Sequence, residues 1–119
     1  MKKLLFIVSS PPYSHKRGTE LLDAALVAGA FDCDVSVLFR DDGVWSLEAH
    51  EQGNASGQRS FAKMLTGLAD YDIDRLYACR ESMVERGIHP NPKLAITVAN
   101  HGDQQRLIAA QDAVIGAAP

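Results

Sequence analysis

The sequence predicts an α/β fold, a three-layer flavodoxin-like sandwich in which helices cover both faces of a five-stranded, mainly parallel sheet. Two observations support this prediction. Short apolar runs alternate along the chain with segments whose apolar residues recur at helical spacing. The chain has 119 residues, 46% of them hydrophobic and 23% charged, which fits one compact domain over residues 1–119.

The first part of the chain supplies two strands and one helix. Leu4–Val8 is a continuous apolar run, which is typical of a strand buried on both faces of a parallel sheet. Thr19 is expected to cap a helix over Glu20–Ala30, whose apolar residues form one stripe. Val35–Phe39 is the second predicted strand. The Asp41-Asp42-Gly43 sequence that follows it predicts a turn.

The middle of the chain continues the alternation. Residues 48–58 show no apolar periodicity and are expected to form a mobile surface loop that function could use. Apolar residues recur at helical spacing from Phe61 to Leu68 and predict a second helix that ends near Asp70. Arg75–Cys79 is a short third strand that leads directly into a compact helix over Arg80–Arg86. Gly87 is expected to end that helix in the left-handed conformation.

The last part of the chain completes the sheet. Pro90 and Pro92 interrupt regular structure before the fourth predicted strand, Leu94–Val98, which is rich in β-branched residues. A last helix is expected over Asp103–Gln111, and a short fifth strand over Ala113–Ile115. Alternation of this kind predicts right-handed crossovers between parallel strands.

Composition argues against several classes of protein. The net charge is −3, from 12 basic and 15 acidic residues without a long block of either sign, so direct binding of nucleic acid is not expected. No apolar run approaches the ~18 residues of a membrane-spanning helix. The apolar run near the start is too short for a secretion signal. We therefore expect a cytoplasmic protein without a membrane span.

The metal-ligating residue types are scattered along the sequence. The two cysteines lack the C-x-x-C spacing of zinc and redox sites. No two histidines are three or four residues apart, so we interpret all of them as solvated loop residues. These histidines are His15, His50, His89 and His101. Neither a metal nor an organic cofactor is predicted.

Ligands of parallel α/β folds bind at the carboxyl ends of the strands, and three well-known kinds of site can be tested there. A flavodoxin needs a phosphate cradle after the first strand, but Pro11 and Pro12 remove two backbone N–H donors from that loop. A response-regulator receiver needs an aspartate at the end of the third strand, where Cys79 stands. Neither a P-loop nor a G-x-G-x-x-G dinucleotide motif occurs.

Cys79 is the candidate reactive group, because it ends a strand and precedes a helix. Unpaired backbone N–H groups and the helix dipole favour an anion at such a position, which would make the thiolate a usable nucleophile. Arg80 adds positive charge, and the turn over residues 41–43 is expected beside the site. The alternative interpretation is that Cys79 is a small apolar side chain of the core. Cys33, at the opposite end of the sheet, is interpreted as structural.

Two motifs and one further segment of the sequence resemble the TusC/DsrF family. Residues 71–88 are similar to a strand, cysteine and short helix with the pattern C-x-x-S-[LM]-x-x-R-G-[LI], which begins at Cys79. Phe39–Trp45 resembles the ending of the family's second strand, apolar-x-D-D-G-V-aromatic, and Leu22–Leu26 resembles its first helix. The resemblance covers nearly the whole chain and is least specific over residues 94–119.

The resemblance implies a subunit that joins TusB-like and TusD-like relatives in a heterohexamer. That assembly passes persulfide sulfur from a TusA-like to a TusE-like protein, for 2-thiouridine formation at the tRNA wobble position. In the family the accepted sulfur carrier is a cysteine of the TusD/DsrE-type subunit. A chain of the TusC/DsrF type is thus expected to be a supporting subunit of a sulfurtransferase complex rather than an independent enzyme.

The candidate site therefore consists of one possible persulfide carrier, Cys79, with possible lining residues Asp41, Asp42, Gly43 and Arg80. Thiol–persulfide exchange at such a cysteine requires no cofactor. Two alternatives stay open. One is a DsrF-type subunit that serves sulfur oxidation, and the other is a small stand-alone α/β ligand-binding domain.

Overall fold

The computed structural model describes residues 1–10, 17–48, 65, 67–92 and 94–116. The predicted loop over residues 48–58 lies outside this part of the chain except for Glu48. Of the helix predicted from Phe61 to near Asp70, only Leu65 and residues 67–70 are described. Leu68 begins a short 3-10 helix.

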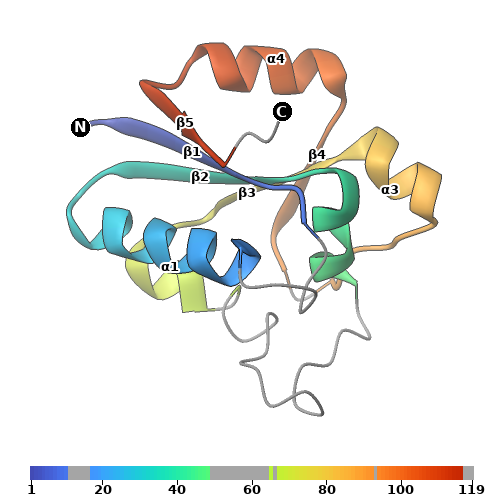
Figure 1. Cartoon of the computed structure of the whole chain (residues 1–119), viewed down its shortest axis with the longest axis horizontal. Helices are drawn as coiled ribbons and strands as arrows, with labels where there is room; N and C mark the ends of the chain where they lie inside the picture. Colours follow the sequence, from blue (N-terminus) through green and yellow to red (C-terminus); the bar gives the residue numbers. More distant parts are fainter. Residues whose placement is uncertain (11–16, 49–64, 66, 93, 117–119) are drawn as a thin grey trace.

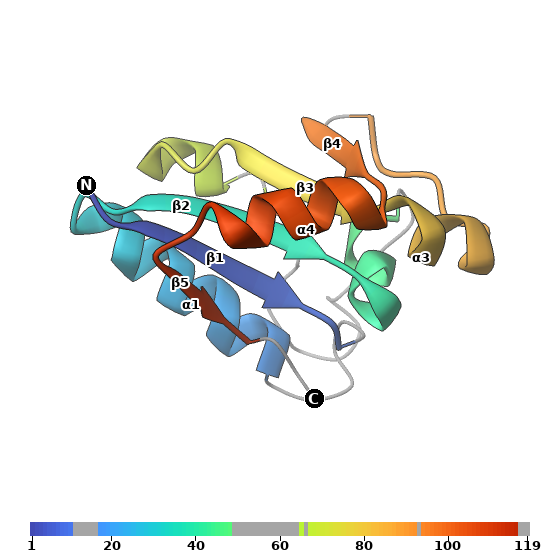
Figure 2. The same cartoon turned by 90° about the horizontal axis from the view of Figure 1, so that it is seen from above.

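Five parallel strands form one sheet in the order β4-β3-β2-β1-β5 (Figure 2). The strands are β1 (Lys3–Val8), β2 (Asp34–Phe39), β3 (Arg75–Cys79), β4 (Ile96–Ala99) and β5 (Ala113–Ile115). All four pairings between neighbours are parallel. The predicted α/β class, with its five strands in one sheet, is confirmed.

Helices lie on both faces of this sheet. They are α1 (Arg17–Ala30), α3 (Arg80–Arg86) and α4 (His101–Ala109), with 3-10 helices η1 (Asp41–Leu47) and η3 (Leu68–Tyr71). Figure 1 shows α1 and η3 below the sheet, α4 above it, and α3 beyond the strand ends. The chain steps from β1 to β4 in one direction and then returns past β1 to β5. A right-handed crossover in the reverse direction places its helix on the opposite face, which explains the position of α4.

None of the helices in the described part of the chain is long and apolar enough to cross a membrane.

Several predicted boundaries are wrong by a few residues. Helix α1 begins at Arg17, so Thr19 lies inside it and is not its cap. Strand β4 begins at Ile96 rather than at Leu94, because the Ile96 N–H donates to the Leu94 carbonyl at 3.0 Å in a tight turn. The turn predicted over residues 41–43 is the start of η1.

The last helix begins two residues earlier than predicted. Its N-cap is Asn100, whose side chain accepts a hydrogen bond from the Asp103 N–H at 2.8 Å. The Asp103 carboxylate in turn accepts the Asn100 N–H at 3.2 Å, which completes a capping box. Asp103, the predicted start, is therefore the third residue of α4, and His101 is its first.

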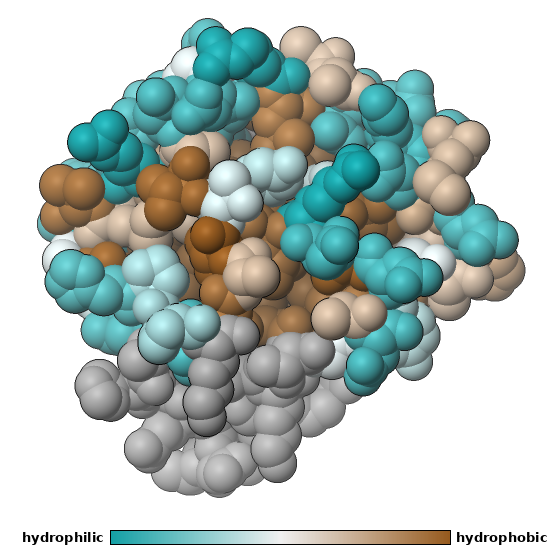
Figure 3. Space-filling view, turned by 180° about the vertical axis from the view of Figure 1, so that it is seen from behind, coloured by the Kyte–Doolittle hydropathy of each residue, from teal (hydrophilic) through white to brown (hydrophobic). Residues whose placement is uncertain are grey.

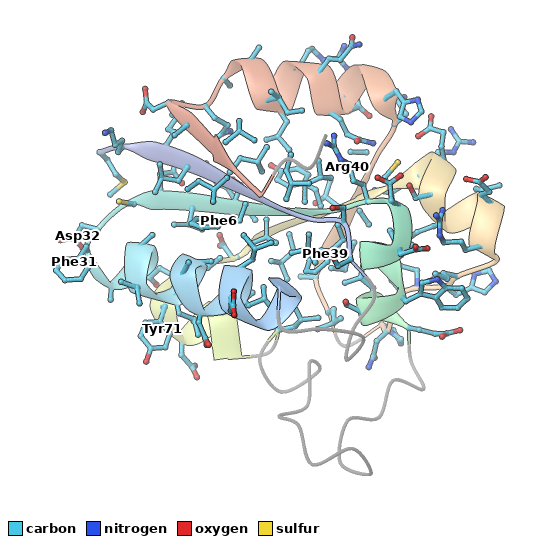
Figure 4. The ribbon with its side chains drawn as sticks, in the orientation of Figure 1. Phe6, Phe31, Asp32, Phe39, Arg40 and Tyr71 are labelled. Atoms are coloured by element: carbon cyan, nitrogen blue, oxygen red, sulfur yellow. The ribbon has the colours of Figure 1, made fainter. Side chains whose placement is uncertain are left out.

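Apolar side chains fill two layers, one on each face of the sheet. The larger layer lies on the α1 side and includes Phe6 and Phe39, which Figure 4 shows below the sheet. The smaller layer, Leu5, Ile7 and Leu38, lies on the α4 side, where Leu107 and Ile108 pack against it. Tyr77 also packs against this smaller layer. Because side chains alternate along a strand, Cys79 belongs to the same side of β3 as Tyr77.

Gly43 lies unusually close to the end of β1. A Cβ atom added to Gly43 would lie 1.9 Å from the Val8 carbonyl oxygen, far inside any contact distance. The same oxygen accepts the Arg40 N–H at 3.1 Å. The end of β1 and the start of η1 are thus in backbone contact, and only glycine fits at this position.

We expect Gly43→Ala to lower the free energy of unfolding by about 1–3 kcal/mol or more, because backbone must move to admit the methyl group. Gly67→Ala is the matched control, since among the described residues no non-neighbouring atom lies within 4 Å of its added Cβ, and its φ is −70°. That variant should be neutral or slightly stabilising, by about 0.4–1 kcal/mol. Chemical denaturation measures both, and equal losses would contradict the close contact.

Candidate functional site

Cys79 lies where the sequence predicts, at the junction of β3 and α3. It is the N-cap residue of α3, and its sulfur accepts the Ser82 N–H at 3.5 Å. The residue is only 2% exposed. Cys79 therefore stabilises the first turn of α3 as its N-cap.

Ser82 connects Cys79 to the turn after β2. Its hydroxyl oxygen accepts the backbone N–H of Asp41 at 2.9 Å, while its own N–H donates to the cysteine sulfur. A second contact joins the same elements, because the Arg86 Nε donates to the Asp42 carboxylate at 3.1 Å. The turn containing Asp41, Asp42 and Gly43 thus packs against α3, next to the cysteine. Sequence analysis did not single out Ser82, although the fourth position of the C-x-x-S pattern pointed to it.

The rest of that motif closes the helix. Gly87 has φ 65°, the left-handed conformation predicted for it, and its N–H donates to the Val84 carbonyl. The Ile88 N–H donates to the Met83 carbonyl at 3.0 Å, and the Ile88 side chain is buried. These two hydrogen bonds make a Schellman ending. The motif around Cys79 therefore has a structural role in nearly every position.

Arg80 and Cys33 contribute little to the site. Arg80 is exposed, and within the described residues no hydrogen bond or ion pair joins it to Cys79. Cys33 immediately precedes β2 and packs against the larger core layer. Figure 4 shows its neighbours Phe31 and Asp32 at the opposite end of the sheet from Arg40, which is the location predicted for Cys33.

Two side chains that sequence analysis missed, Glu81 and His101, lie beside Cys79. The Cys79 thiol is 3.7 Å from Glu81 Oε1, and His101 Nε2 is 3.8 Å from the same oxygen. The thiol, the carboxylate and the imidazole offer atoms that all lie within 4.8 Å of one another. The interpretation of His101 as a loop residue is wrong, because it is the first residue of α4.

The register of the sheet explains the position of His101. Cys79 pairs with Ala99 across β3 and β4, and His101 follows Ala99 by two residues. The buried Gln104 side chain donates to the Ala99 carbonyl at 3.0 Å, which ties the first turn of α4 to the strand end. The capping box of Asn100 fixes the same turn.

The Glu81 side chain is 44% exposed, and its pKa is lowered. Its own backbone N–H holds the pKa of the carboxyl below its ordinary value. The backbone N–H and the positive charge of His101 lower the pKa further, as does the hydrogen bond from the Cys79 thiol. A carboxylate thus lies beside the thiol, where it accepts the hydrogen bond of the thiol and can serve as a metal ligand.

Within the described residues, Cys79, Glu81 and His101 form the one group of three such side chains that could share a metal ion. The arrangement thus offers a thiol nucleophile with a carboxylate near its proton, or a mixed sulfur, oxygen and nitrogen donor set.

Comparison with known proteins identifies a family and several relatives. The family model described as the DsrE/DsrF-like family matches residues 2–116. The chain is 35% identical over 88 residues to the intracellular sulfur oxidation protein DsrF of Allochromatium vinosum, which covers 74% of this chain and 65% of that protein. It is 37% identical over 90 residues to protein TusC of Klebsiella pneumoniae, which covers 76% of each.

The fold also matches a solved structure. The crystal structure of the YchN protein from E. coli superposes with a TM-score of 0.81 at 16% identity, over 97% of this chain and 98% of that one. At this level of identity the similarity shows the fold alone.

We expect Ser82→Ala to lower the free energy of unfolding by about 1–3 kcal/mol, because the Asp41 N–H loses its partner. Ser46→Ala is a matched control: this serine is equally buried, and its hydroxyl has no hydrogen-bond partner in the described structure. The control should be neutral or stabilising in the same denaturation experiment. If both variants lost the same stability, the Ser82 link would be energetically irrelevant.

Proposed function

This chain belongs to the DsrE/DsrF-like family, and we propose that it is a supporting, TusC-like subunit of a cytoplasmic sulfur-relay complex. The main observation in support is that the two family motifs of the chain contact each other beside Cys79. The turn over residues 41–43 and the helix after Cys79 are joined through Ser82 and Arg86. Relatives named TusC and DsrF, at 32–37% identity over most of the chain, support the same role.

In the proposed complex the chain assembles with TusB-like and TusD-like subunits as a heterohexamer. Sulfur would pass as persulfide from a TusA-like protein to a TusE-like protein, for 2-thiouridine formation at the tRNA wobble position. The second candidate is a subunit for sulfur oxidation, since the A. vinosum relative is named for that process. The identity of the co-purifying partners separates the two.

An apolar hollow on the surface supports a partner-binding role. Figure 3 shows apolar side chains gathered in the middle of the face that is turned away in Figure 1. Beside edge strand β4, the hollow is lined by Leu65, Ala69, Ile73, Leu76, Leu94 and Ala95, together with Asp74. Ala69, Leu94 and Ala95 leave part of this lining accessible beside the edge of the sheet, where a partner chain can pack.

The geometry also bears on whether Cys79 carries sulfur. As a carrier, its thiolate would attack the outer sulfur of an incoming persulfide, a new S–S bond would form, and the donor thiolate would leave. The contact to Glu81 Oε1 disfavours this role, because a negative charge beside the sulfur works against formation of the thiolate. Burial and the capping bond from Ser82 favour a structural role. We therefore propose that Cys79 has a structural role in this subunit and does not carry sulfur.

We expect the full chain, co-expressed with TusB-like and TusD-like relatives from the same genome, to purify in a stable complex with both. A chain that eluted alone, as a monomer or homo-oligomer, would instead support a stand-alone ligand-binding domain. Loading the complex from a persulfide donor and measuring intact masses should add sulfur to the TusD-like subunit and none to this chain. A gain of one sulfur atom here, lost in Cys79→Ala and kept in Cys33→Ala, would make Cys79 a carrier.

A further inference from the structure

We propose that Cys79, Glu81 and His101 bind a zinc ion at the carboxyl edge of the sheet, between the first turns of α3 and α4. The three side chains come from three separate elements: the end of β3, α3 and α4. Their donor atoms, a thiolate sulfur, a carboxylate oxygen and an imidazole nitrogen, are the kinds that zinc prefers. The sulfur-relay role neither uses nor requires this site.

The distances fit a single tetrahedral ion. With zinc bonds of roughly 2.3 Å to sulfur and 2.0–2.2 Å to nitrogen and oxygen, neighbouring ligand atoms lie roughly 3.4–3.6 Å apart. The observed distance from the Cys79 sulfur to Glu81 Oε1 is 3.7 Å, and from His101 Nε2 to that oxygen 3.8 Å. The sulfur and the imidazole nitrogen are also within 4.8 Å. Small rotations of two exposed side chains would therefore complete the site.

The surroundings hold two of the ligands in place. The Ser82 N–H donates to the Cys79 sulfur, and this bond persists when a thiolate binds an ion. The backbone of His101 is fixed by the Asn100 capping box and by the bond from Gln104 to the Ala99 carbonyl. Glu81 is free to adjust.

Charge and access favour the ion as well. Thiolate and carboxylate together neutralise a divalent cation, which reduces the cost of placing charge beside the buried sulfur. The Glu81 and His101 side chains are 44% and 71% exposed, so an ion can enter from their side. Three protein ligands leave a fourth tetrahedral position for water.

Zinc binding and sulfur carriage would compete for one atom. A thiolate that donates its lone pair to zinc is not available to attack a persulfide. The site is thus a reason why a cysteine at this strand end could be present in a subunit that does not carry sulfur.

We expect the tag-free full chain, reduced and stripped with a chelator, to bind one Co²⁺ ion used as a spectroscopic probe. Bound Co²⁺ should show thiolate-to-cobalt charge-transfer absorption and the strong visible bands of tetrahedral cobalt, and Zn²⁺ should displace it. Cys79→Ser should abolish the charge-transfer band. His101→Gln and Glu81→Gln should each weaken Zn²⁺ binding at least about tenfold, measured by competition with a chromophoric chelator.

Matched controls come from the same residue types elsewhere in the chain. Cys33→Ser and His89→Gln should leave the spectrum and the affinity unchanged, since neither residue belongs to the group of three. Because Glu81 and His101 are exposed, their variants should keep the thermal stability of the parent chain. Failure to bind Co²⁺, a spectrum without the thiolate band, or unchanged affinity in His101→Gln would overturn the proposal. Co-purification with the partner subunits does not depend on any of these results.

Discussion

One constraint places all the groups of the site: five strands lie parallel in one sheet, so their carboxyl ends share one edge. The turn over residues 41–43 follows β2, Cys79 ends β3, and His101 follows β4. These residues lie up to 60 positions apart in the sequence, from 41 to 101, and only the parallel arrangement brings them together. A chain of similar composition with antiparallel strands would distribute the same side chains over both ends of the sheet.

Within that frame, backbone contacts decide which residue types are required. Gly43 is fixed by the Val8 carbonyl, and Asp41, with φ 51°, occupies a left-handed conformation that aspartate tolerates better than most residues. Ser82 accepts the Asp41 N–H and so stabilises this turn from the neighbouring element. The D-D-G and C-x-x-S motifs are therefore two halves of one contact. Their residue types follow from packing and hydrogen bonding before any chemistry of sulfur is considered.

Features that depend on local residue patterns could be predicted from the sequence. Contacts that depend on the register between β3 and β4 could not. The strands are visible as apolar runs, and the left-handed Gly87 follows from its place after a short helix. The position of His101 beside Cys79 does not follow from sequence spacing, because no other histidine lies three or four residues away. Its actual neighbour is set by the pairing of Cys79 with Ala99, and the expected helix start at Asp103 left His101 in a loop.

Three roles of this site, helix cap, zinc ligand and persulfide carrier, would all use the buried sulfur of Cys79. As a cap, it accepts one N–H from Ser82 and needs no contact with solvent. As a zinc ligand it keeps that hydrogen bond, because an ion bonded to the sulfur approaches from the side of Glu81 and His101. As a persulfide carrier it would have to hold a second sulfur atom and present it to another protein, although the residue is almost fully enclosed. The cap and the zinc ligand are compatible with each other and with this burial, whereas sulfur carriage requires the junction of β3 and α3 to open.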